Sequence, residues 1–407
     1  MPVVSFANLF FVSLIALSAP ALLGFFPRLR IPSVAVAIAA GIALGPSGLG
    51  LVSVDIPVRI LSLLGLAFLL FLAGLEIDVR RLRGRVLLLA VTGYGLTLVL
   101  GALSGLLFAA LHWTRSPLLL AVTLSATSLG LVVPVLLDAG QAEGRTGQAV
   151  IAASSVAEFG GVLLLSLLFS TAGGTIGARV VTLIVFVALV AAIGAAATMA
   201  GRAVQLDRVF LRLQDTTAEL RVRAAVALLI GLVVLAERFG LETILGAFLA
   251  GAIVGVVDRG TTTHPRFRAK LDAIGYGFLV PVFFITSGLQ LDLRGLFASP
   301  SALLRVPAFL VALLIVRGVP ALLFRGSIGA RNSYAAALLQ ATSLPLIVTA
   351  TQIGVALGLL HPVNAAALVC AGLLSTLIFP ATALALLRRR RPPAGQPRPA
   401  PMCEGMW

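Results

Sequence analysis

Long apolar runs, separated by short polar or Arg-rich segments, follow one another along the chain. A helix of about 20 apolar residues is long enough to cross the hydrocarbon core of a bilayer. The runs therefore predict about 13 transmembrane helices, near residues 5–26, 31–50, 58–78, 86–111, 117–137, 147–170, 178–200, 222–237, 241–257, 273–291, 302–324, 332–357 and 363–387. The expected fold class is an all-α polytopic membrane protein.

The distribution of positive charge predicts the orientation of these helices. Most of the 30 Lys and Arg residues lie after the odd-numbered helices. The connections after the even-numbered helices contain only Arg59, Arg115, Arg179, Arg238, Arg294 and Arg305. Because Lys and Arg concentrate in cytoplasmic loops, we expect the N-terminus outside and the C-terminus in the cytoplasm.

Composition supports a membrane protein and explains the net charge. Hydrophobic residues make up 59% of the 407 residues and charged residues only 11%, a balance that a soluble domain does not need. The formal net charge of +15 follows the predicted topology, so it does not indicate a nucleic-acid partner. We expect a multi-pass protein of the bacterial cytoplasmic membrane, with lipid as its surroundings.

Matching segments occur in the two halves of the chain. Ala-Thr-Ser-Leu occurs twice, and two glycine-containing pairs recur in the same order: 126–129 with 341–344, 40–41 with 250–251, and 74–75 with 288–289. Each pair of matching helices is seven helices apart. Because seven is odd, the two halves are expected to be inverted repeats, a design typical of secondary transporters.

The repeats define the expected domain organisation. Residues 1–388 form one transmembrane domain, in which the first repeat covers about 31–170 and the second about 241–387. A linker helix and loop at 178–221 join them. Its polar part, 201–221, fits either an amphipathic helix on the cytoplasmic surface or a solvated linker. The Pro- and Arg-rich residues 389–407 are expected to form a disordered basic cytoplasmic tail.

Both Ala-Thr-Ser copies lie in the middle of an apolar run, where they predict broken helices. The hydroxyls of Thr127 and Ser128, and of Thr342 and Ser343, can bond to their own backbone and weaken a helix. Pro345 lacks an N–H group and disrupts the preceding turn. Non-helical backbone at this depth is tolerated only inside protein or beside a wet cavity, so two crossing breaks would gather four helix ends near the bilayer midplane.

Two ionisable residues lie deep in the predicted helices, Glu158 in the sixth and Arg317 in the eleventh. Each is costly in a membrane and requires a partner or water. Ser154 lies four residues before Glu158 and so shares its helix face. Glu158 is the candidate carboxylate for protons and cations, and Arg317 is a charge-compensating group. The alternative is a buried Glu–Arg pair that only fastens two helices.

Several motifs resemble the monovalent cation:proton antiporter-2 family of the sodium/proton exchanger superfamily, which includes Kef- and Nap-type membrane domains. The segment 40–50 resembles the second helix of that family, 71–78 the third and 283–289 the tenth. The resemblance covers about residues 5–388. It implies a homodimer in which a core domain slides against a dimerisation domain, exchanging Na⁺ or K⁺ for H⁺ by alternating access without a cofactor.

The resemblance also suggests roles for individual residues. Many electrogenic members have two adjacent acids in the sixth helix, whereas this chain has Ala157 followed by Glu158 in place of the usual Asp. Arg317 stands where those members have Lys. Loss of the first acid resembles the electroneutral branch, so we expect one cation per proton. Thr127 and Ser154 match cation-ligand positions of that branch.

Further residues with hydroxyl or carboxyl groups are candidates for the cation site and the second helix break. Ser128 and Ser155 are neighbouring hydroxyls that could bind the cation, while Thr342, Ser343 and Pro345 complete the second break. Glu76 is a possible further ligand, and the alternative is a structural acid at the membrane interface.

Other functions remain open at this stage. A Kef-type potassium efflux system shares this membrane part but uses a cytoplasmic nucleotide-binding domain, so it would need a separate regulatory subunit here. An organic-anion symporter could use the same inverted architecture. An enzyme is not expected, since His112, His264 and His361 show neither metal-ligand spacing nor a nucleophile–base pairing.

Overall fold

The computed structural model describes residues 5–25, 33–76, 84–138, 140–169, 176–201, 219–260, 265–298 and 300–388. The described chain is helical and contains no strand. The polar linker 202–218, predicted as an interfacial helix or a solvated linker, and the tail 389–407, predicted to be disordered, lie outside these residues.

Every predicted transmembrane segment corresponds to one or more helices. The first half contains α1 (Ala7–Phe25), α2 (Ser33–Leu44), α3 (Ile56–Glu76), α4 (Gly84–Ala110), α5 (Pro117–Ser125), α6 (Leu129–Asp138), α7 (Arg145–Phe169) and α8 (Ile176–Gly201). The second half contains α10 (Leu220–Arg238), α11 (Thr243–Gly260), α12 (Pro265–Ile274), the π-helix η1 (Gly275–Leu279), α13 (Val280–Leu289), α14 (Leu293–Phe297), α15 (Pro300–Leu303), α16 (Arg305–Ala321), η2 (Leu322–Phe324), α17 (Arg325–Ile328), α18 (Ala330–Gln340), α19 (Pro345–Ala356) and α20 (Pro362–Arg388).

Length and composition identify many of these helices as membrane spans. Within the described residues, nine helical stretches are long and apolar enough to cross a membrane, and three shorter apolar helices accompany them. Two of the nine are the broken pairs α5–α6 and α18–α19. The chain is thus a multi-pass membrane protein, while the count of 13 and the orientation of the termini stay predictions.

Some predicted boundaries were wrong. The helix expected at 31–50 ends at Leu44, because Gly45 to Gly50 form a tight turn in which Gly50 has a φ of 68°. The helix expected at 273–291 begins earlier, at Pro265, and includes the π-helical turn η1. Apolar runs do not reveal such turns, since the side chains on both sides of them remain apolar.

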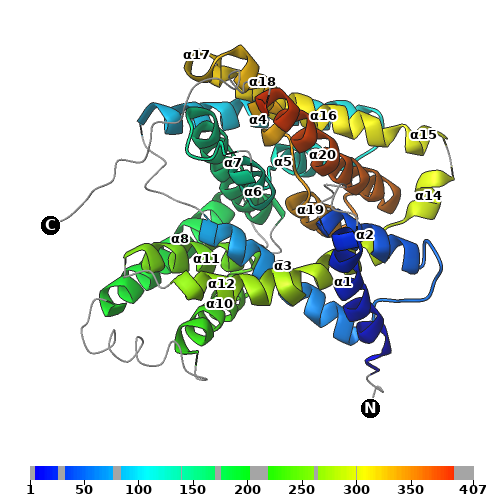
Figure 1. The fold of residues 1–407 in the computed structure, drawn as a ribbon, viewed down its shortest axis with the longest axis horizontal. Helices are drawn as coiled ribbons and strands as arrows, with labels where there is room; N and C mark the ends of the chain where they lie inside the picture. The colour runs from blue at the N-terminus through cyan, green and yellow to red at the C-terminus, as the bar shows by residue number, and fades with distance from the viewer. Residues whose placement is uncertain are drawn as a thin grey trace, which may run out of the picture.

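The helices form two bundles, which Figure 1 shows one above the other. The site bundle contains α4, α5, α6, α7, α16, α18, α19 and α20. The scaffold bundle contains α1, α2, α3, α8, α10, α11, α12 and α13. Two chain segments far apart in sequence therefore contribute to each bundle, as two intertwined halves require.

Close glycine contacts hold the scaffold bundle together. A Cβ atom at Gly74 would overlap the carbonyl oxygen of Phe248, and one at Gly251 would overlap that of Phe71. These contacts join α3 to α11, and equivalent contacts at Gly41 and Gly288 join α2 to α13. Exchanging the two sequence halves turns one contact into the other, while the inverted repeat itself stays a prediction.

Candidate functional site

Both predicted helix breaks are present in the site bundle. Helix α5 ends at Ser125, and α6 begins at Leu129 after three non-helical residues. Helix α18 ends at Gln340, and α19 begins at Pro345. The hydroxyl residues at both breaks are buried, so protein surrounds the irregular backbone as the membrane environment requires.

The two breaks cross in direct contact. The backbone N–H of Ser128 donates to the carbonyl oxygen of Thr342 at 3.1 Å. The Thr127 hydroxyl donates to the carbonyl oxygen of Gln340 at 2.7 Å. The crossing brings together the ends of α5, α6, α18 and α19, whose unpaired backbone groups carry partial charges.

Glu158 on α7 lies at the N-terminal end of α6. The backbone N–H of Leu129, the first residue of α6, donates to Glu158 Oε2 at 3.0 Å. The side chain is buried, with 7% of its surface exposed. A carboxylate is favoured at the positive end of a helix, so local structure explains how this acid is tolerated at membrane depth.

Arg317 on α16 lies at the C-terminal end of α18, whereas Glu158 lies at the N-terminal end of α6. Its Nε donates to Thr127 Oγ1 at 2.6 Å and to the carbonyl oxygen of Gln340 at 3.3 Å. Its Nη1 donates to Thr97 Oγ1 at 3.1 Å. A cation is favoured beside the negative end of a helix.

The Glu158–Arg317 ion pair considered from the sequence is not formed. None of the ion pairs between described residues joins these two side chains. Each charge lies at a different half-helix end. The interpretation of the two residues as a simple fastening pair is therefore wrong, because Arg317 uses its donors on hydroxyls and a carbonyl.

Ser375 on α20 occupies a place similar to that of Glu158, in the second repeat. Its hydroxyl accepts from the N–H of Ser343, just before α19, at 3.2 Å. It donates to the carbonyl oxygens of Ser343 and Gly372. The N-terminal end of α6 thus contacts an acid, whereas the N-terminal end of α19 contacts a neutral hydroxyl.

Several buried polar atoms around the crossing have no hydrogen-bond partner. Among the described residues they include Ser154 Oγ, Ser343 Oγ, Gln340 Nε2 and Arg317 Nη2. Burying such atoms without a partner is costly, so they usually mark a functional position or a missing ion or water. Ser154 lies one turn before Glu158 on α7.

The remaining predicted site residues have more ordinary surroundings. Ser128 and Ser155 are buried, whereas the Thr342 hydroxyl donates to the Leu338 carbonyl one turn earlier. Pro345 is the first residue of α19, where its missing N–H leaves no donor unpaired. The Thr127 hydroxyl is used by Arg317 and Gln340, so it lies on the Arg317 side of the crossing.

Glu76 lies in the scaffold bundle, at the end of α3, but beside the broken helix α6. Its Oε2 atom is buried without a partner, and its Oε1 atom lies 3.7 Å from Arg268 Nη2. A Cβ atom added to Gly130 on α6 would lie 3.8 Å from Glu76 Oε2 and 3.4 Å from the Tyr276 hydroxyl. Glu76 thus faces the site bundle.

Sequence reasoning missed four residues at or near the site: Thr97, Gln340, Ser375 and Tyr276. Gln340 directly precedes the second Ala-Thr-Ser, so its position was a usable signal. The other three are ordinary polar residues in apolar helices, and only the packing reveals them.

In the described part of the chain, no group of three or more His, Cys, Asp or Glu could hold a metal ion.

Residues 13–389 match the family model "Sodium/hydrogen exchanger, transmembrane". The chain belongs to this family. It is similar to the "Putative Na(+)/H(+) antiporter YjbQ" of Bacillus subtilis, with 30% identity over 96% of this chain and 64% of the relative. The chain thus spans under two thirds of that relative.

Two further similarities involve more distant proteins. The chain is 28% identical to the chloroplastic "K(+) efflux antiporter 1" of Arabidopsis thaliana, over 65% of this chain and 22% of the relative. The structure of the sodium proton antiporter MjNhaP1 from Methanocaldococcus jannaschii superposes with a TM-score of 0.63 and 17% identity. This superposition covers 94% of this chain and 98% of that one, which shows that the fold is shared.

Proposed function

We propose that this chain exchanges a monovalent cation, Na⁺ or K⁺, for H⁺ across the membrane, with Glu158 as the shared binding carboxylate. The observation that carries the proposal is the position of Glu158 at a helix break, beside the unpartnered Ser154 hydroxyl. Family membership and the names of the relatives support the same reaction class.

Competition at one carboxylate couples the two ions. The Leu129 N–H holds Glu158 Oε2, and the carboxyl group can then carry either a proton or a cation. A buried charged carboxylate needs a counter-charge, whereas a protonated one does not. Each ion therefore displaces the other, and the loaded forms carry no unpaired charge.

The proposed stoichiometry is one cation per proton. Glu158 is the most deeply buried acidic side chain among the described residues, whereas Glu76 keeps 16% of its side-chain surface exposed beside Arg268. The residue before Glu158 is Ala157. The Arg317 charge is fixed by Thr127, Thr97 and the Gln340 carbonyl. With one titrating site, exchange is electroneutral.

Alternating access would come from movement of the site bundle against the scaffold bundle. The close glycine packing of α3 with α11 and of α2 with α13 makes the scaffold a rigid support. We propose that a homodimer forms through the scaffold, as in the family that the sequence resembles. Kef-type potassium efflux with a separate regulatory subunit would use the same site.

The test is proton flux in proteoliposomes that contain the purified protein and a pH-sensitive dye. Pulses of Na⁺, K⁺ or Li⁺ are applied with and without a potassium ionophore that clamps the voltage. We expect a response to at least one cation, independent of the clamp, and no response in Glu158→Gln. Glu237→Gln is the matched control, since this acid is exposed at the end of α10.

Three outcomes would contradict parts of the proposal. Cation-coupled proton flux retained in a folded Glu158→Gln variant would remove Glu158 from the mechanism. A response that depends on the voltage would rule out one-for-one exchange. No response to any cation in the wild type would favour an organic-anion symporter or a system that needs a separate subunit.

A further inference from the structure

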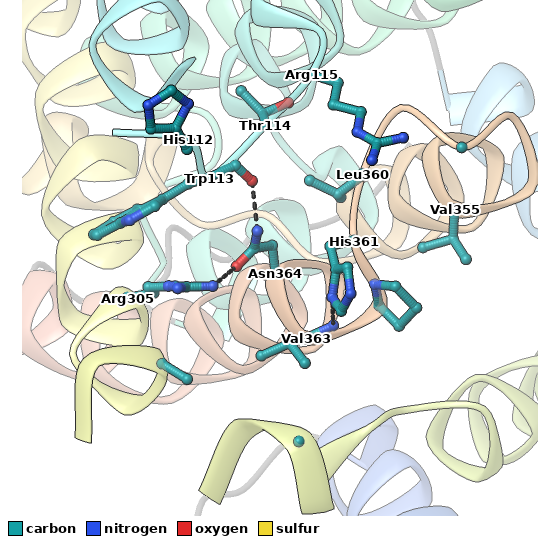
Figure 2. A pocket seen from close by; sticks show the side chains of 14 residues that line it. His112, Trp113, Thr114, Arg115, Arg305, Val355, Leu360, His361, Val363 and Asn364 are labelled. Carbon is teal, nitrogen blue, oxygen red and sulfur yellow. Dashed lines mark hydrogen bonds between the residues drawn. The ribbon is translucent and has the colours of Figure 1, made fainter. Parts of the chain in front are cut away.

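A polar cavity lies at the end of the site bundle that the charge distribution predicts to be outside. It has a volume of about 600 Å³ and is bounded by the α4–α5 loop, the α15–α16 region, the α19–α20 loop and α14. Figure 2 shows Arg115, Arg305 and His361 coming to it from three of these segments, while the His112 ring points away from them. None of the described residues that line it is acidic.

Hydrogen bonds and a cation–π contact connect several residues that line the cavity. Asn364 is buried, and its side chain accepts a hydrogen bond from Arg305 Nη1 and donates to the carbonyl oxygen of Trp113 (Figure 2). The Arg305 guanidinium also lies over the Trp113 ring, 5.4 Å from its centroid. The Arg115 N–H donates to the Leu359 carbonyl and so joins the two loops. These contacts hold the Arg305 guanidinium and the backbone of the two loops in place before any ligand binds.

Some hydrogen-bond donors of the cavity lining have no partner. Arg305 Nε is buried and has no hydrogen-bond partner. None of the ion pairs between described residues involves Arg305 or Arg115. His361 Nδ1 accepts from the Val363 N–H at 3.4 Å. The nearest acid along α14, Asp292, accepts from the Gly295 N–H as a helix cap.

We propose that this cavity binds an anionic phosphate group, through Arg115 and Arg305 with His112 and His361 at its edge. Guanidinium groups bind phosphate oxygens with paired, charge-assisted hydrogen bonds. A phospholipid headgroup and free inorganic phosphate share this chemistry. Exposed apolar residues next to the lining in sequence, Leu111 and Leu304, would accompany the acyl chains of a lipid.

The position of the cavity connects it to movement between the bundles. Helix α14 is part of the connection from α13 of the scaffold to the site bundle, and Gly295 on α14 lines the cavity. Gly295 also packs against Val363 at the start of α20. An anion bound here would tie the connection to the site bundle and stabilise their present arrangement.

Two binding measurements on the full chain test the site and identify the source of the anion. Thermal unfolding in detergent is followed with added inorganic phosphate, using chloride at equal ionic strength as the reference. Native mass spectrometry measures retention of phosphatidylglycerol against phosphatidylcholine. We expect binding of the phosphate group to weaken about tenfold in Arg115→Gln, equivalent to about 1.4 kcal/mol, because the neutral amide loses the charge-assisted hydrogen bonds of the guanidinium.

Arg294→Gln is the matched control, because Arg294 is a cation on the same end of the molecule outside the cavity lining. Stabilisation by phosphate that is lost only in Arg115→Gln would indicate a site for free anions. Selective loss of retained phosphatidylglycerol would indicate a headgroup site. Equal behaviour of the two variants, or no preference for either probe in the wild type, would overturn the proposal. Neither measurement depends on cation exchange.

Discussion

At the residue scale, the site is defined by where its charges meet backbone dipoles. Glu158 accepts from the first N–H of α6, and Arg317 donates to the last residue of α18. Each side chain thus offsets a partial charge that a broken helix leaves unpaired. The helix breaks explain the buried charges, and the buried charges in turn stabilise the breaks.

Ser154→Ala should weaken cation binding without abolishing exchange. The Ser154 hydroxyl is buried without a partner one turn from Glu158, so its removal takes away one cation ligand while the carboxylate remains. We expect the apparent KM for the cation to rise about tenfold, equivalent to about 1.4 kcal/mol. Cation titration of the dye response measures this change. Ser13→Ala on α1 is the control, and an unchanged KM would show that Ser154 is not a ligand.

Arg317→Ala should destabilise the protein more than it changes ion selectivity. The substitution removes the donor to the buried Thr127 and Thr97 hydroxyl oxygens and one of the two donors to the Gln340 carbonyl, with a cost on the order of 3 kcal/mol. Thermal unfolding in detergent should show a lower Tm, partly restored in Arg317→Lys. Arg294→Ala serves as the exposed control. A Tm equal to that of the wild type would contradict the structural role of Arg317.

At the element scale, the scaffold depends on helices that approach at glycine. The added Cβ atom of an alanine at Gly251 would overlap the Phe71 carbonyl oxygen, which belongs to rigid backbone. By contrast, Gly231 on α10 has open space around its Cα atom. The two positions therefore form a matched pair for testing the α3–α11 contact.

Gly251→Ala should destabilise the folded protein by about 1–3 kcal/mol, the usual cost of overpacking. Gly231→Ala should be neutral or stabilising, because Ala favours helix more than Gly by about 1 kcal/mol. Thermal unfolding of both variants in detergent measures the difference. If Gly251→Ala is as stable as Gly231→Ala, the two helices do not pack as closely as described.

At the scale of the whole molecule, direct polar contacts join the two bundles. One of them is the hydrogen bond from Gln352 Nε2 on α19 to Ser287 Oγ on α13, at 3.1 Å. Both residues line a cavity of about 300 Å³ between the bundles. A contact of this kind must break if one bundle slides past the other.

Cross-linking the bundles at this contact should stop exchange. Cysteines at Ser287 and Gln352, in a chain without Cys370 and Cys403, are joined by a short bifunctional thiol reagent. We expect proton flux to fall at least about tenfold, since the movement that limits turnover is blocked. A pair at Asn8 and Asp55, which are hydrogen-bonded within the scaffold, is the control. Full flux after cross-linking at Ser287 and Gln352 would contradict bundle movement.

The sequence alone determined the features that depend on local chemistry. Apolar runs of membrane length predicted the helices, and Ala-Thr-Ser with Pro345 placed both breaks correctly, because hydroxyls and proline disturb the helix in which they occur. Glu158 and Arg317 could be selected as the deep charges, since burying an ionisable group has a cost that sequence position already implies.

Only the tertiary structure decided which groups meet. Arg317 bonds to Thr127 and to Gln340, and Ser375 serves the second break, although these partners lie far apart or look unremarkable in sequence. The cavity around Asn364 likewise brings together three segments of the chain. From the sequence, the basic residues of these segments indicated only the membrane topology. Hydropathy and helix propensity act along the chain, whereas the choice of a hydrogen-bond partner depends on how the helices cross.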